Sequence, residues 1–397
     1  MTQSLFSSLQ ALPDDPILGL NEEFKKDPRP NKVNLGVGVY LTEEGKLPLL
    51  KTVETAEQRL VARQTTHGYT PMSGNPLFCE ALQHLVFGES VARTEKRIAT
   101  IQTLGGTGAL RLGAMLAHEA LGASAGIVSN PTWGNHVSLF EHAGLAVSRY
   151  PYYDPAGHAL NRDAFFSALE ALAPKTVVLL HACCHNPTGV DLSHEDWTRV
   201  LEIVQERHLI PFMDMAYQGL GNGLDEDAFA LRLFANAGVS LLAATSCSKN
   251  FGLYGERTGA LHVVTGSSQE AAVIESILKS TVRKEYSNPP AHGGQIVAEI
   301  LTNPELSAAW RAEVLEMRTR VRSMREALAK AGKDAGINLD FVVDQQGMFS
   351  FTGLKAEQME KLRQDYAVYG INNGRICIAG LNHSNVSYVA ESLAKVL

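Results

Sequence analysis

The feature that constrains this chain most is a regular alternation, from about residue 97, of short apolar runs and longer amphipathic stretches. The runs include RIATIQTL, SAGIVS, TVVLLHA and LIPFMDMA. In the longer stretches, the apolar residues recur with the spacing of one helix face. Short strands that alternate with helices build βαβ units, in which the strands run parallel. The chain is therefore expected to be an α/β protein with a mostly parallel sheet flanked by helices.

The length of the chain and a change of pattern near residue 304 predict a second, smaller lobe. The 397 residues exceed the roughly 250–300 at which a single core stops growing. A long charged helical pattern is followed by the runs INLDFVVDQQGMFSFTG and GRICIAG, which are expected to form a small group of strands. We predict a large domain over residues 46–309 and a smaller α/β domain from residues 1–45, which include an N-terminal arm, and 310–397.

Composition and charge exclude several kinds of partner. The net charge is -7 and the sequence has no basic run, so the electrostatic footprint of a nucleic-acid-binding protein is missing. No apolar stretch approaches the roughly 20 residues that span a bilayer, and the first residues lack the pattern of a secretory signal. The five cysteines form no CxxC pair, which favours reduced thiols. We expect a cytoplasmic protein without nucleic-acid or membrane partners.

The run HACCH at residues 181–185 has the composition of a zinc site. On a helix, its two histidines would share one face. The preceding TVVLL predicts a strand, however, and the following NPTG predicts a tight turn. Alternate side chains of a strand point to opposite faces, and no second ligand pair follows at zinc spacing. We therefore expect no metal here.

Polar residues follow the ends of the predicted strands. In a doubly wound sheet, the carboxyl ends of the strands meet in the crevice where ligands bind. The residues expected there are Gly106 and Thr107 in GGTGALR, Trp133 in NPTWGNH, Asn186 in HNPTG, Asp214 and Tyr217 in DMAYQG, Ser246, Ser248 and Lys249 in SCSKN, and Arg257. Glycines after a strand let a ligand approach the backbone, and the following helix start offers free N–H groups to an anion. These residues are expected to form one ligand site.

Each of these signals has a plainer explanation when taken alone. The glycine run can be a simple turn, and it departs from the dinucleotide-binding pattern because a third glycine is replaced by Arg111. Trp133 can be a core residue and Lys249 a solvated one. Together, however, a phosphate cradle, a flat stacking surface, an acid and a lysine suit one cofactor, pyridoxal 5'-phosphate. The lysine would bond covalently to its aldehyde, and the acid would keep its ring nitrogen protonated.

Several motifs then resemble a known family. They are GGTGALR, HACCHNPTG, DMAYQG, SCSKNFGLYGER, YSNPPAHG and GRICIAG. In this order, over nearly the whole chain, they closely resemble the class I aminotransferases of fold type I, the aspartate and aromatic amino acid transaminases. The resemblance implies a fold type I transferase that depends on pyridoxal phosphate, with a mixed, mostly parallel sheet in the large domain and a smaller α/β domain beside it.

The resemblance also implies a role for each residue at the strand ends. Lys249 would hold the cofactor and act as general base, and Asp214 would pair with the ring nitrogen. Tyr217 and Asn186 would bond the phenolic oxygen, and Trp133 would lie over the ring. The residues implied around the phosphate are Gly106, Thr107, Ser246, Arg257 and, from a neighbouring subunit, Tyr69. Ser248 is also expected at the cofactor, and His136 would support Asp214 without touching the cofactor.

Two arginines imply a substrate with two carboxylates. Arg375 in GRICIAG matches the family's clamp for the α-carboxylate, which a planar guanidinium binds through two hydrogen bonds. Arg283 matches the residue that reads a side-chain carboxylate from the neighbouring subunit. Without the resemblance, both arginines could equally be solvated. Other residues expected at the substrate are Gly38, Trp133 and Asn186. In the family, the residues that match Arg283 and Tyr69 reach into the active site of the neighbouring subunit. A homodimer with two shared active sites is therefore implied.

The amino donor depends on two leucines. Aspartate enzymes of the family carry Lys and Thr where this chain has Leu41 and Leu47. Apolar residues there favour an aromatic ring through burial of apolar area. Residues of the aspartate type are kept at Val39, Thr107 and Asn288. We predict ping-pong transfer from tyrosine and phenylalanine, and also from aspartate, to 2-oxoglutarate; a strict aspartate aminotransferase is the alternative.

Two readings from other classes stay open at this point. A different pyridoxal-phosphate chemistry, such as decarboxylation or β-elimination, would share Lys249 and Asp214 but has less use for both arginines. A binding protein without catalysis would keep the fold but would not need Lys249, Asp214 and Arg375 together.

Overall fold

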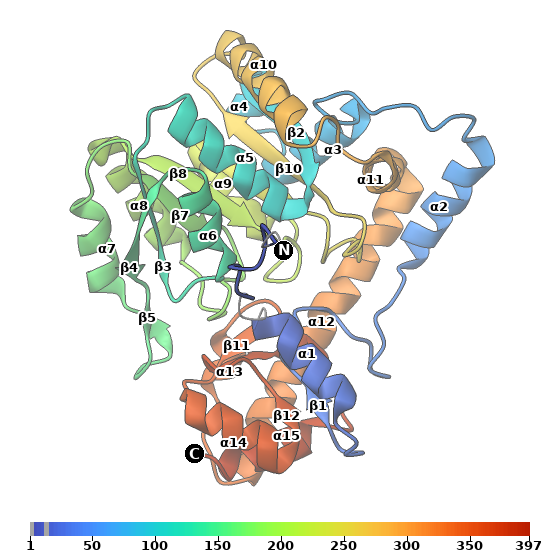
Figure 1. Ribbon diagram of the computed structural model, residues 1–397, viewed down its shortest axis with the longest axis vertical. Coiled ribbons are helices and arrows are strands. Elements are labelled where there is room, and N and C mark those ends of the chain that lie inside the picture. The colour runs from blue at the N-terminus through green and yellow to red at the C-terminus, as the bar shows by residue number, and fades with distance from the viewer. Residues whose placement is uncertain (1–3, 12–15) are drawn as a thin grey trace.

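A seven-stranded sheet forms the centre of the larger of two lobes (Figure 1). The computed structural model describes residues 4–11 and 16–397. In spatial order the strands are β2 (Ile98–Leu104), β10 (Thr258–Val264), β9 (Leu241–Ser246), β8 (Ile210–Met215), β7 (Val177–His181), β3 (Ala125–Asn130) and β4 (Ala146–Pro151). Within this sheet, β10 runs antiparallel to both of its neighbours and the other pairs are parallel. The predicted α/β class with a mixed, mostly parallel sheet is confirmed.

Apolar side chains leave both faces of this sheet. Neighbouring residues of a strand point to opposite faces, so Leu179 and Leu180 pack into different apolar clusters, as do Phe212 and Met213. One face is covered by α5 (Gly105–Glu119), α6 (Asn135–His142) and α10 (Ser268–Glu285). The other is covered by α3 (Pro76–Phe87), α7 (Arg162–Glu170), α9 (Phe229–Asn236) and α11 (Ala291–Thr302). Burial on both faces explains the continuous apolar runs of the sequence.

The smaller lobe combines N-terminal and C-terminal elements. They are α1 (Pro16–Lys26), β1 (Val33–Asn34), α13 (Phe341–Asp344), β11 (Phe349–Phe351), α14 (Ala356–Tyr366), β12 (Val368–Tyr369), β13 (Arg375–Cys377), η2 (Ile378–Gly380) and α15 (Val386–Ala394). β1 pairs in parallel with β12, and β11 pairs antiparallel with β13. The long helix α12 (Pro304–Asp334) runs from the large lobe into the small one (Figure 1). Since this helix continues through residue 310, the domain limits at that point stay a prediction.

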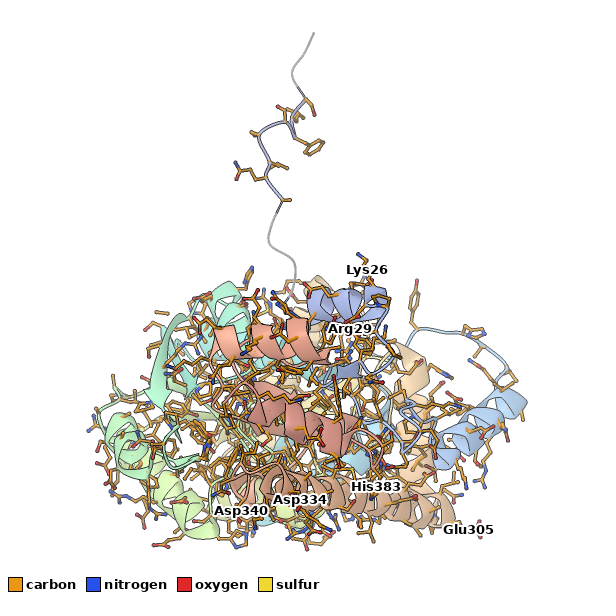
Figure 2. All side chains as sticks on the ribbon, turned by 90° about the horizontal axis from the view of Figure 1, so that it is seen from below. Lys26, Arg29, Glu305, Asp334, Asp340 and His383 are labelled. Carbon is orange, nitrogen blue, oxygen red and sulfur yellow. The ribbon has the colours of Figure 1, made fainter. Side chains whose placement is uncertain are left out.

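The remaining elements extend the larger lobe. They are α2 (Lys51–Arg63), α4 (Val91–Thr94), β5 (Tyr153–Asp154), β6 (Ala159–Leu160), α8 (His194–Arg207) and η1 (Glu226–Ala228). β5 and β6 form a short antiparallel hairpin. Residues 4–11 lie apart from both lobes (Figure 2). Among the described helices, none is long and apolar enough to cross a membrane.

One prediction for the smaller lobe is wrong in part. The run at residues 337–353 was expected to form strands, but residues 341–344 form the helix α13 and only residues 349–351 form a strand. The N–H groups of Val342 and Val343 bond to the carbonyl groups three residues earlier. These local turns satisfy the backbone before the chain reaches β11, so no strand partner is needed there.

We expect Gly113→Ala to destabilise the large lobe. A Cβ at Gly113, on α5, would overlap the ring of Phe212 on β8. Overpacking of this kind costs about 1–3 kcal/mol of unfolding free energy, which a shift of the urea midpoint would measure. Gly134→Ala is the matched control, because no atom lies within 4 Å of a Cβ there and the backbone is already helical. Equal losses in both variants would contradict the packing argument.

Candidate active site

The carboxyl ends of β7, β8 and β9 open into a pocket of about 240 Å³. Its lining brings together most of the predicted residues: Gly38, Gly106, Thr107, Trp133, Asn186, Asp214, Tyr217, Ser246, Ser248, Lys249, Arg257 and Arg375. These residues come from segments far apart in sequence. They meet here because parallel strands place their carboxyl ends at one edge of the sheet. The small lobe contributes Arg375 from β13.

Lys249 lies in the pocket close to a carboxylate. Its Nζ is 4.9 Å from the centre of the Tyr217 ring. Burial lowers the pKa of Lys249 to about 8; the positive charges of Arg257 and Arg375 act in the same direction, and the negative charge of Asp214 opposes them. An amine with this pKa is neutral in a useful fraction of molecules near physiological pH and can act as a nucleophile or a base.

Asp214 near the end of β8 is held in its ionised form. Burial alone would raise the pKa of this carboxyl, but the hydrogen bond with His136 and the positive charge of Lys249 keep it below its usual value. The His136 Nε2 lies 3.1 Å from the Asp214 Oδ2, and the His136 Nδ1 lies 2.8 Å from the Thr132 Oγ1. His136 therefore lies behind Asp214, outside the pocket lining. A negative charge at this position can pair with a positively charged group of a ligand.

The start of α5 forms a cradle for an anion. Gly105 has φ +67°, which glycine adopts without strain, and a Cβ there would lie 2.6 Å from the Arg257 Nη2. The N-cap residue Leu104 makes no side-chain hydrogen bond to the first turn, so the N–H groups of that turn can bind an anion. Across the cradle, the Arg257 Nη1 donates to the Ser248 Oγ at 3.4 Å, and the Ser246 Oγ accepts from the Ser248 N–H at 3.2 Å.

Arg375 joins the two lobes and keeps one donor free. Its Nη2 donates to the Gly36 carbonyl oxygen at 2.7 Å, and its Nη1 donates to the Asn186 Oδ1 at 3.3 Å. The Asn186 Nδ2 lies 3.4 Å from the Tyr217 hydroxyl. The buried Nε of Arg375 has no hydrogen-bond partner in the described part of the chain. An unsatisfied buried N–H is costly, so this group is suited to a ligand carboxylate.

Besides His136, four predicted site residues lie outside the pocket lining. Tyr69 exposes 95% of its surface and Leu47 exposes 51%, whereas Leu41 is half-buried. Arg283 near the end of α10 is exposed, and its Nη1 donates to the Ser287 Oγ at 2.6 Å. The single chain does not bring these side chains to Lys249, so their roles stay predictions.

Three residues of the lining were not predicted: Leu110, Ala216 and Phe349. Leu110 is three residues after Thr107 on α5, and Ala216 directly precedes Tyr217, so helix spacing and proximity in sequence could have indicated both. Phe349 had no such signal. It reaches the pocket because β11 pairs with β13, which carries Arg375. The paired residues of these strands are 24 to 28 positions apart in sequence, and local pattern does not reveal such a pairing.

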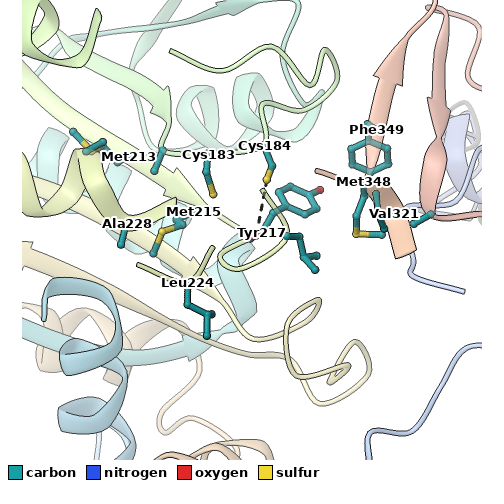
Figure 3. Packing of buried hydrophobic residues seen from close by; sticks show 14 of the residues in the cluster. Cys183, Cys184, Met213, Met215, Tyr217, Leu224, Ala228, Val321, Met348 and Phe349 are labelled. Carbon is teal, nitrogen blue, oxygen red and sulfur yellow. Dashed lines mark hydrogen bonds between the residues drawn. The ribbon is translucent and has the colours of Figure 1, made fainter. Parts of the chain in front are cut away.

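The histidines and the cysteines of the HACCH run do not share one cluster of possible metal ligands. His181 and His185 do not group with the cysteines, and the cluster that does form joins Cys183 and Cys184 with Asp227. Figure 3 shows the two cysteines side by side, with Cys184 linked to Tyr217. Both oxygens of Asp227 accept hydrogen bonds from backbone N–H groups of residues 219–223. The carboxylate therefore serves to hold this loop.

The pocket at the sheet edge combines an ionised acid, a lysine of lowered pKa, an anion cradle and an arginine with an unpartnered donor. This combination is typical of enzymes that bind a phosphorylated aldehyde cofactor through lysine. Residues 30–393 match the family described as aminotransferase class I and II. The chain belongs to this family, as its motifs predicted, and it is an aminotransferase.

Relatives of two kinds are similar to the whole chain. The chain is 47% identical to an aspartate aminotransferase of Pseudomonas aeruginosa, over 99% of this chain and 100% of that one. It is 46% identical to an aromatic-amino-acid aminotransferase of Escherichia coli, again over 99% and 100%. Among solved structures, an aromatic-amino-acid aminotransferase from Burkholderia pseudomallei, covalently bound to pyridoxal phosphate, has a TM-score of 0.97 at 47% identity and covers 100% of both chains. These findings confirm the predicted fold type.

Proposed function

We propose that this chain uses pyridoxal phosphate to move the amino group of tyrosine and phenylalanine, and also of aspartate, to 2-oxoglutarate. The observation that carries the proposal is the pocket that unites Lys249, Asp214 and the unpartnered Nε of Arg375. A strict aspartate aminotransferase is the second candidate, because relatives with the two names are 47% and 46% identical to the chain.

The residues of the pocket fit the cofactor. The free N–H groups at the start of α5, with Ser246 and Arg257, suit a phosphate. The ionised Asp214 suits a protonated ring nitrogen, and Trp133 on the pocket wall offers a flat surface to the ring. When bound, pyridoxal phosphate supplies an electron sink for the negative charge that develops at the substrate Cα.

Lys249 would both hold the cofactor and move a proton. As a neutral amine, the Lys249 Nζ would take the proton from the substrate Cα as general base and return it, as general acid, to the carbonyl carbon of the cofactor. Asp214, kept ionised by His136, would stabilise a positive charge on the ring nitrogen. Asn186 and Tyr217, whose side chains hydrogen-bond to each other, would bond the phenolic oxygen.

Two arginines would select the substrates. Arg375 would bind the α-carboxylate through its free Nε and an Nη, a geometry that a planar guanidinium favours. Arg283 would bind the second carboxylate of aspartate and 2-oxoglutarate. Leu41 and Leu47 support the aromatic donors, because the exposed surface of Leu47 and the exposed part of the half-buried Leu41 are available for an aromatic ring to cover, at about 25 cal/mol per Å² of apolar area buried.

A homodimer with shared active sites, in the cytoplasm, is part of the proposal. Tyr69 and the exposed Arg283 cannot serve Lys249 of their own chain where they stand. Tyr69 lines a separate depression of about 530 Å³ together with residues 286–292. A phenol ring exposed to this degree is typical of a contact that a second copy of the chain would cover.

The uptake of pyridoxal phosphate by the cofactor-free protein should depend on pH through Lys249. Only the neutral amine reacts, so the rate should rise about tenfold per pH unit below the pKa and level off above about 8. Stopped-flow absorbance would measure it. Asp214→Asn should move the midpoint to lower pH, because it removes the charge that raises this pKa. A plateau reached only at the ordinary pKa of lysine would contradict the argument.

The two donor candidates are separated by a half-reaction. Holoenzyme mixed with L-phenylalanine or L-aspartate, without a 2-oxo acid, should lose its yellow absorbance faster with phenylalanine. The double variant Leu41→Lys, Leu47→Thr should lower kcat/KM for phenylalanine about tenfold more than for aspartate, since it removes apolar area and adds a positive charge. Equal losses for both donors, or faster reaction of the wild type with aspartate, would favour the strict aspartate aminotransferase.

Shared sites predict complementation between two inactive variants. Lys249→Ala removes the amine of one site, and Arg283→Ala removes the guanidinium that would reach the partner's site. An equal mixture of the two variants is refolded and then assayed with aspartate and 2-oxoglutarate. It should recover about a quarter of the wild-type activity, because half of the dimers contain both variants and each of these has one intact site of two. A mixture as inactive as its components would rule out this sharing.

A further inference from the structure

Phe349 on β11 packs against three parts of the substrate pocket. The centre of its ring lies 4.3 Å from the guanidinium carbon of Arg375, and the ring meets that of Tyr217 edge-on at 5.8 Å and 85°. A Cβ at Gly38 would lie 2.8 Å from the Phe349 Cζ, so the ring also closes against the backbone there. Figure 3 shows Phe349 and Tyr217 approaching each other from the two lobes. The position of this ring therefore limits where the Arg375 guanidinium can lie.

A single buried arginine, Arg325 on α12, holds the main chain that carries this ring. Its Nη2 donates to the carbonyl oxygens of Gly347 and Phe349 at 2.7 and 2.6 Å, and to that of Gln346 at 3.1 Å. Its Nη1 donates to the carbonyl oxygen of Val342 at 2.8 Å. Arg325 exposes only 2% of its surface. One guanidinium thus binds both ends of the segment 342–349.

The hydrogen bonds of Arg325 depend on the planar shape of its guanidinium. Burial lowers its pKa to about 10, which still leaves it charged at neutral pH. Its hydrogen bonds go to main-chain carbonyl groups, and a fixed fork of N–H donors can reach all four of them at once. A lysine ammonium keeps the charge but has three donors and no plane, so it cannot reproduce the set.

The same segment is docked on the turn that carries Asn186. The Gln346 N–H donates to the Gly189 carbonyl oxygen at 2.6 Å, and a Cβ at Gly189 would lie 2.8 Å from the Phe349 carbonyl oxygen. Arg325 thus holds the place where the small lobe meets the turn of the large lobe. Asn186, at the start of this turn, is itself a hydrogen-bond partner of Arg375.

We propose that Arg325 is a positioning residue for the substrate α-carboxylate, acting through Phe349 on Arg375. The inference rests on the role of Arg375 in the proposed function. If the segment 342–349 relaxes, the Phe349 ring no longer supports the guanidinium face, and Arg375 keeps only its bonds to Gly36 and Asn186. Binding of carboxylates is weakened, whereas proton transfer by Lys249 is little affected because Arg325 touches neither Lys249 nor Asp214.

The test measures carboxylate binding and turnover separately. Calorimetry gives the Kd of 3-phenylpropanoate, which has a carboxylate and an aromatic ring but no amino group to react, for the holoenzyme of each variant. Arg325→Lys and Phe349→Leu should each raise this Kd, and the KM for phenylalanine, about tenfold, and Arg325→Lys should keep kcat within about twofold of the wild type. The double variant should be little worse than either single one, because both changes act on the same contact.

A buried arginine far from the pocket provides the control. Arg97 is 8% exposed and its Nη1 donates to the Thr265 carbonyl oxygen at 3.1 Å, at the opposite end of β2 and β10 from the pocket. Arg97→Lys should lower stability without changing the Kd of 3-phenylpropanoate. If it raises the Kd as much as Arg325→Lys does, general destabilisation explains the effect and the inference is overturned.

The remaining outcomes are also decisive. An unchanged Kd in Phe349→Leu overturns the inference even if Arg325→Lys fails to fold, and fully additive effects in the double variant overturn the path through Phe349. The role of Arg375 is checked separately with Arg375→Lys. If this variant binds 3-phenylpropanoate as tightly as the wild type, the proposed carboxylate site fails, and the positioning role fails with it.

Discussion

The burial of Lys249 beside the buried Asp214 is the interaction on which the rest of the site depends. Each charge would be costly to bury alone, and the two stabilise each other only because the strands hold them at one sheet edge. His136 adds a hydrogen bond that keeps the carboxylate ionised. Although Asp214 opposes it, burial still lowers the pKa of Lys249 to about 8, so that the amine can be neutral when it acts as nucleophile or base. The apolar layers on both faces of the sheet supply the rigidity that maintains this pair.

The substrate side of the pocket depends on a different constraint, the position of the small lobe. Arg375 belongs to that lobe, yet it bonds to Asn186 of the large lobe and packs on Phe349. Helix α12 connects the lobes and carries Arg325 into the junction. The cofactor half of the site is therefore built on one rigid sheet, whereas the carboxylate half relies on contacts between two bodies. We infer that changes at the junction affect substrate binding before they affect the chemistry at Lys249.

Much of the fold and of the cofactor half could be predicted from the sequence. Strand and helix patterns are local, and each residue from Thr107 to Lys249 that follows a strand had to lie near the others once the strands were parallel. The substrate half was less predictable. The segment 337–344 was expected to form a strand and forms turns and the helix α13, because local carbonyl groups satisfy its N–H groups. Phe349 and Arg325 gave no signal, since their partners are chosen by packing between distant segments.

By itself, the sequence determined which chemical groups are present and the order of strands and helices that carries them, because periodicity and turn chemistry act over a few residues. Only the tertiary structure decided which of those groups lose contact with water. Burial sets the lowered pKa of Lys249, leaves the Arg375 Nε without a partner, and directs the four bonds of Arg325 to main-chain carbonyls. These properties depend on the exclusion of solvent by segments far apart in the chain, and a linear pattern contains no measure of that.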